Sequence, residues 1–145
     1  MQLTATFLAI LASQALSIHM WSHPDAEAEC GALGVMEWDL DALQGDYDLP
    51  QLRKCREHPL SENIHSRDED DGLNYLMKRK CVSNSTRGAA CSDGWCWSTC
   101  RGATGSWCWL AKNNGTGAWQ KCSSGCKARG LGCGKGNCKA CGCGC

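Results

Sequence analysis

Cysteine limits the fold of this 145-residue chain more than any other feature. Twelve of its fourteen cysteines lie in residues 80–145, and only Cys30 and Cys55 lie earlier. This density in a short chain is typical of a disulfide scaffold formed in an oxidising compartment. Each part holds an even number of cysteines, so each can close its own bridges. We expect all of them to form disulfides: Cys30, Cys55, Cys81, Cys91, Cys96, Cys100, Cys108, Cys122, Cys126, Cys133, Cys138, Cys141, Cys143 and Cys145.

Large aliphatic side chains are scarce in residues 80–145, where only Val82, Leu110 and Leu131 occur. A chain of this size cannot build a sufficient apolar core from them. Five tryptophans and up to six disulfides must take its place. The pairing stays open, because twelve cysteines allow on the order of ten thousand connectivities.

Charge changes at the same point as cysteine content. Residues 18–79 hold fourteen acidic and six basic residues, a net charge of −8, whereas residues 80–145 hold nine basic residues and one acidic residue, a net charge of +8. Such asymmetry indicates two parts with different roles. The positive part suggests an anionic partner, such as a membrane surface or an acidic polysaccharide, although the charge could serve only solubility.

The beginning of the chain predicts its compartment. An apolar run from Leu3 to Leu16 ends in small residues, as in a signal peptide cleaved after Ser17 or after Ala15. No other apolar run approaches the roughly 20 residues of a membrane span. We therefore expect a secreted, extracellular protein, and nucleic acid is not an expected partner.

A dibasic pair, Lys78-Arg79, marks the boundary between the two parts and follows a polar, charged stretch at 61–72. Secretory processing proteases cut after such pairs, although an exposed pair in an uncleaved chain is the alternative. The predicted organisation is a signal peptide at 1–17, an acidic pro-segment at 18–79 closed by Cys30–Cys55, and a mature cysteine-rich basic domain at 80–145.

Two Trp-Cys-Trp triplets and a later tryptophan lie between turn-forming stretches, which predicts strands at about 94–100, 106–111 and 117–122. Cys122 and Cys126 are spaced for one helical turn. The expected fold is therefore small and disulfide-rich: a short antiparallel β-meander with a helical turn, preceded by a largely irregular acidic pro-segment.

Alternation along these strands sorts the side chains onto two faces. Cys96, Cys100, Cys108, Leu110 and Cys122 fall on one face. The other face could stack a sugar ring or anchor in a membrane interface, or its rings could only cover the disulfide core. The candidate ligand-binding residues on it are Trp95, Trp97, Trp107, Trp109, Trp119 and Lys121.

Other chemistry has little support in the sequence. The tail CKACGCGC has metallothionein-like spacing, but oxidation to disulfides competes, so we expect no metal and no cofactor. Residues 80–145 contain no His or Glu and only Asp93 as a carboxylate, so we expect no enzyme. Asn84 and Asn114 begin sequons open to glycosylation. We expect a monomer.

The layout resembles the small secreted cysteine-rich proteins of filamentous fungi, which include effector candidates. The phrase from Cys30-Gly-Ala-Leu-Gly-Val35 through Leu49-Pro50 to Arg53-Lys-Cys55-Arg-Glu-His-Pro59 is similar to a recurring pro-region of such proteins. In addition, Cys122-x3-Cys126 followed by Cys141-x-Cys143 resembles the helix-to-strand disulfide pattern of defensin-like peptides, although the extra cysteines and the Gly-rich tail depart from it.

The function expected from these features is that of a secreted effector or toxin-like protein acting on a host or competitor outside the producing cell. Two alternatives remain open: an antimicrobial peptide that disrupts anionic membranes, and a carbohydrate-binding module for a polymer such as chitin.

Overall fold

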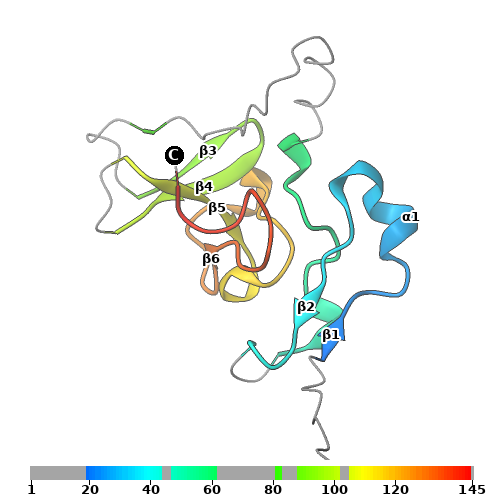
Figure 1. Ribbon diagram of the computed structural model, residues 1–145. Coiled ribbons are helices and arrows are strands. Elements are labelled where there is room, and N and C mark those ends of the chain that lie inside the picture. Colours follow the sequence, from blue (N-terminus) through cyan, green and yellow to red (C-terminus); the bar gives the residue numbers. More distant parts are fainter. Residues whose placement is uncertain (1–18, 44–46, 62–80, 83–87, 102–104, 145) are drawn as a thin grey trace, which may run out of the picture.

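A computed structural model describes residues 19–43, 47–61, 81–82, 88–101 and 105–144 (Figure 1). The predicted signal peptide with Ser17, the processing pair Lys78-Arg79, the sequon residue Asn84 and Cys145 lie outside these residues. We call the described residues between 19 and 61 the first part and the described residues between 81 and 144 the cysteine-rich part. No helix among the described residues is long and apolar enough to cross a membrane.

The first part has little regular secondary structure, as the sequence predicts. Strand β1 (Met20–Trp21) pairs antiparallel with β2 (Trp38–Asp39), and the five-residue helix α1 (Ala26–Cys30) lies between them in the chain. The first part also holds three 3-10 turns, η1 (Gly31–Leu33), η2 (Leu49–Gln51) and η3 (Pro59–Ser61). Alanine and glutamate favour α1, and Glu27 and Glu29 in its first turn complement the helix dipole.

Long-range contacts fix these short elements. The predicted bridge Cys30–Cys55 joins the end of α1 to the later segment, and a β-bridge pairs Val35 with Cys55. Met36, Trp38 and Leu52 form a small buried core.

The cysteine-rich part contains a four-stranded antiparallel sheet in the order β3-β4-β5-β6. Its strands are β3 (Ala89–Ser92), β4 (Trp95–Thr99), β5 (Trp107–Ala111) and β6 (Gly132–Cys133). Two further 3-10 turns are η4 (Asn113–Gly115) and η5 (Cys122–Ser124), and η5 is the helical turn expected near Cys122. The antiparallel meander is confirmed.

The third predicted strand differs from the structure. The pairing of β4 with β5 ends at Trp97 and Trp109, and beyond this point the segment 119–121 lies between the two strands. Isolated bridges connect Trp95 with Lys121 and Ala111 with Trp119. The edge beside β5 is instead taken by β6, because the Cys108–Cys133 disulfide brings Cys133 to β5.

Six disulfides join described cysteines, and none of these six links the two parts. Besides Cys30–Cys55 they are Cys91–Cys122, Cys96–Cys126, Cys100–Cys143, Cys108–Cys133 and Cys138–Cys141. Cys81 is also disulfide-bonded, and no described cysteine is free. The resemblance to defensin-like peptides implies bridges from Cys122 and Cys126 to the C-terminal tail. These bridges do not form, because Cys122 bonds Cys91 of β3 and Cys126 bonds Cys96 of β4.

The two predicted faces of the sheet are present. Cys96, Cys108 and Leu110 form a buried cluster with Cys100 and Cys122 packed against it, so the disulfides take the place of an aliphatic core. On the other face Ala111, Trp119 and Ala140 are buried, with Trp95 and Trp109 against them.

Candidate functional site: the tryptophan face

The six predicted ligand-binding residues lie together on one side of the sheet. We call Trp95, Trp97, Trp107, Trp109, Trp119 and Lys121 the tryptophan face. The ring of Trp107 meets Trp97 and Trp109 edge-on, with centroids 5.9 and 4.9 Å away. The Nζ atom of Lys121 lies 5.5 Å from the centroid of the Trp95 ring, within reach of a cation–π interaction.

Side chains of the first part occupy this face. The imidazole of His58, just before η3, stacks on Trp109 with centroids 4.3 Å apart and an angle of 14°. It also meets Trp95 and Trp119 edge-on, both at 5.0 Å. His58 is therefore enclosed by three of the five tryptophans, and only 1% of it is exposed.

Burial among these rings keeps His58 neutral. Desolvation lowers its pKa from 6.5 to about 3, and the Arg53 cation contributes to the decrease. Its Nδ1 atom accepts a hydrogen bond from the backbone N–H of Leu60, so the proton lies on Nε2, which has no hydrogen-bond partner among the described residues. A charged His58 would therefore lack the solvation that it has in water.

Arg53 is the second side chain that the first part places here. Its guanidinium carbon lies 4.2 Å from the centroid of the Trp119 ring and 5.4 Å from that of Trp38, between one ring of each part. Only 3% of the residue is exposed. Burial lowers its pKa from 12.5 to about 10, with a smaller opposing effect of Glu57, so the group stays charged at neutral pH.

The Nη1 and Nη2 atoms of Arg53 donate to backbone carbonyls of the cysteine-rich part, whereas its Nε atom donates to the Cys55 carbonyl of the first part. Nη1 donates to the carbonyls of Gly115 at 3.2 Å and Gly117 at 3.3 Å, and Nη2 donates to that of Lys135 at 2.6 Å. Nη2 also lies 3.3 Å from the Sγ atom of Cys141. No carboxylate forms an ion pair with Arg53 among the described residues.

Glu57 adds two contacts beside Arg53. Its backbone carbonyl accepts a hydrogen bond from the indole N–H of Trp119 at 3.3 Å, and its Oε1 accepts one from the backbone N–H of Lys139 at 3.2 Å. Sequence reasoning missed Arg53, Glu57 and His58 as site residues because it assigned them to a separate pro-segment. Their position next to Cys55, which anchors this segment, was the available signal.

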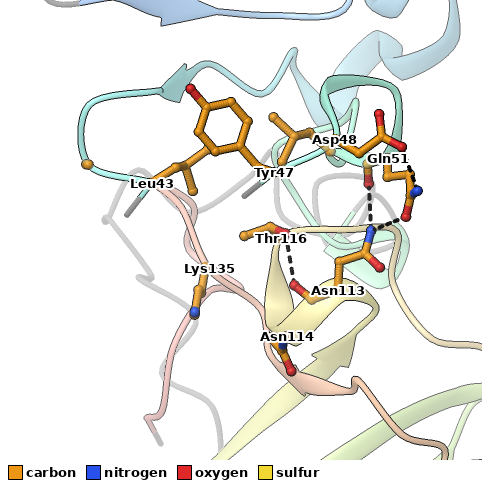
Figure 2. Close-up of a pocket in the computed structure, with 10 residues that line it drawn as sticks. Leu43, Tyr47, Asp48, Gln51, Asn113, Asn114, Thr116 and Lys135 are labelled. Carbon is orange, nitrogen blue, oxygen red and sulfur yellow. Dashed lines mark hydrogen bonds between the residues drawn. The ribbon is translucent and has the colours of Figure 1, made fainter. Parts of the chain in front are cut away.

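A pocket of about 660 Å³ lies where the two parts meet (Figure 2). Asn113 donates from Nδ2 to the Oε1 of Gln51 at 2.9 Å, and Gln51 donates to Asp48 at 2.7 Å. Asn114, the second sequon residue, is exposed on the rim of this pocket with a φ of 52°. Its placement leaves the side chain accessible for modification.

Cysteine sulfurs also gather closely within the fold. Those of Cys100, Cys108, Cys133 and Cys143 all lie within 4.8 Å of one another, but they form two adjacent disulfides. Disulfide sulfur is not the thiolate that binds soft metals, so this cluster is a structural element in its oxidised form.

These features define a class, the small disulfide-rich proteins, whose bridges are typical of extracellular proteins. No protein-family model, curated protein or solved structure matches this chain. Function must therefore be argued from the tryptophan face itself.

Proposed function

We propose that the chain is the precursor of a secreted effector or toxin-like protein whose tryptophan face binds the target. The observation that supports this most is the insertion of His58 and Arg53 among the tryptophans. In this proposal the first part covers a recognition surface, which becomes free only when the first part dissociates after cleavage at Lys78-Arg79. Binding, not catalysis, is the proposed activity.

The chemistry of the covered surface supports this proposal. Five indole rings gather on this face, and the exposed Lys121 adds a cation beside the Trp95 ring. Aromatic residues of this kind supply much of the binding energy in protein interfaces. A folded precursor that left all of them exposed would risk self-association.

The test compares the intact chain with the cleaved protein after its two parts have been separated. We expect the separated cysteine-rich part, applied to plant, insect and microbial cells, to be active against one group, and the intact chain to be inactive. Trp107→Ala and Trp109→Ala should abolish this activity, whereas Lys127→Ala, which removes an exposed cation outside the face, should not. Equal activity of the intact chain, or full activity of both tryptophan variants, would contradict the proposal.

The same face could instead bind a polysaccharide or a membrane, and two assays distinguish these cases. Tryptophan-dependent retention on insoluble chitin would indicate a carbohydrate-binding module. Dye leakage from anionic but not from neutral vesicles at micromolar concentration would indicate an antimicrobial peptide.

A further inference from the structure

The Cys138–Cys141 disulfide differs from the other bridges in its spacing. Its cysteines are 3 positions apart, whereas the other five bridges named above span 25 to 43 positions. Closing so short a loop removes little entropy from the unfolded chain, so this bridge contributes less to stability than the others. Both cysteines are partly exposed.

A buried cation faces one of the two sulfurs. Nη2 of Arg53 lies 3.3 Å from Sγ of Cys141, and Arg53 has no ion-pair partner among the described residues. Three further charged residues lie near this turn: Glu57, whose carboxylate accepts a hydrogen bond from the backbone N–H of Lys139, and the exposed cations Lys135 and Lys139. The Lys135 carbonyl lies 3.2 Å from the same sulfur, but it also accepts the 2.6 Å hydrogen bond from Arg53.

We propose that Cys138–Cys141 is a thiol–disulfide exchange site, in which Arg53 stabilises the thiolate that forms on Cys141. The partner class is a thiol, either a small one such as glutathione or a cysteine of another protein. This chemistry does not depend on the proposed function of the tryptophan face.

The reaction proceeds in two balanced steps. A thiolate of the partner attacks Sγ of Cys138, a mixed disulfide forms, the Cys138–Cys141 bond breaks, and its electron pair goes to Cys141. A second partner thiolate then attacks the partner sulfur of the mixed disulfide and releases Cys138 as a thiolate. Two partner thiols are oxidised to one disulfide, two electrons reduce the protein disulfide, and the two protons pass to the cysteines or to water.

The position of Arg53 sets the direction of attack. The better leaving sulfur is the one whose thiolate is more stable, which is Cys141, so the partner becomes attached to Cys138. Stabilising the reduced form also makes the disulfide a stronger oxidant. Because Arg53 belongs to the first part, this site is complete only while the first part stays docked.

Stepwise reduction of the full chain tests the proposal. The protein is incubated in glutathione buffers of increasing reducing strength, and each disulfide is followed by differential alkylation and peptide mass spectrometry. We expect Cys138–Cys141 to open before the others, with glutathione attached to Cys138. Arg53→Gln should slow this opening at least about ten-fold, whereas Lys139→Gln, which removes a neighbouring exposed charge, should leave it within about two-fold. Simultaneous opening of all bridges, or equal rates in Arg53→Gln and the wild type, would overturn the proposal.

A second measurement decides the question if Arg53→Gln does not fold. In Cys138→Ala the thiol of Cys141 is titrated by its rate of alkylation against pH. We expect its pKa at least about one unit below the usual value of about 8.5. A pKa at or above about 8.5 would overturn the proposal.

Discussion

Three tryptophan rings surround the imidazole of His58, and its burial among them makes the stability of the fold depend on pH. Because its pKa is about 3 in the folded protein and near 6.5 in the unfolded chain, the unfolded chain binds the extra proton between these values. The contribution of His58 to stability is therefore complete above about pH 6.5 and is lost as the pH falls toward 3.

We predict that unfolding at pH 5 takes up about one proton through His58. In His58→Phe, which keeps an aromatic ring in the same place, that uptake should disappear and the midpoint of denaturation should fall less between about pH 7 and pH 5. Denaturant titrations at several pH values measure the difference, and His19→Phe, at an exposed position, is the control. Identical pH profiles for His58→Phe and the wild type would disprove the assignment.

Turn η4 ends at Gly115, whose backbone carbonyl accepts a hydrogen bond from Arg53. Its residues Asn113, Asn114 and Gly115 all have positive φ, with Gly115 at 101°. A Cβ atom on Gly115 would lie 2.0 Å from the carbonyl oxygen of Cys133 in β6. Only glycine lets η4 approach β6 this closely.

We predict that Gly115→Ala prevents η4 from packing on β6 and sharply lowers the yield of the Cys108–Cys133 bridge after oxidative refolding. Gly125→Ala is the matched control, because Gly125 also has positive φ (78°) but a Cβ atom there would have no neighbouring atom within 4 Å. Gly125→Ala should lower the free energy of unfolding by only about 1 kcal/mol, the cost of placing a residue with a Cβ atom at positive φ. Disulfide mapping measures both, and similar yields would show that the clash is unimportant.

The elements also show what could be predicted without the structure. Period-two alternation places Trp and Cys on opposite faces wherever a strand forms, so both faces follow from the triplets alone. Strand β3 was missed although Asp93-Gly94, with φ values of 51° and 81°, is a strong hairpin signal. Residues 117–122 were predicted to form the strand next to residues 106–111. Local sequence pattern does not show disulfide pairing, and the Cys108–Cys133 bridge places β6 at this edge of β5 instead.

Only half of the candidate site could be predicted from the sequence. The tryptophan face could be predicted from the sequence of the cysteine-rich part alone. Arg53, Glu57 and His58, in contrast, are far in sequence from the residues that they contact. The hydrogen bonds of Arg53 and Glu57 to the cysteine-rich part span 62 to 88 positions. A polar residue in an irregular, acidic segment usually lies in solvent. Its burial against tryptophan depends on the three-dimensional docking of one part on the other.

For the molecule as a whole, opposite net charge favours this docking. Residues 18–79 carry −8 and residues 80–145 carry +8. We predict that the two pieces stay associated after cleavage at Arg79, and that their dissociation constant rises roughly ten-fold between about 50 and about 500 mM salt, because salt screens exposed charges. Size-exclusion chromatography of the cleaved protein measures this, and separation at low salt would contradict it.

The first part docks on the cysteine-rich part with His58 inside the tryptophan face. NMR spectroscopy of the intact chain tests this docking, because the imidazole protons of His58 report the rings around them. We predict strong upfield ring-current shifts, nuclear Overhauser contacts with Trp109, Trp95 and Trp119, and no titration of His58 down to about pH 4. Random-coil shifts without these contacts, and a titration near pH 6.5, would show that the first part does not cover this face.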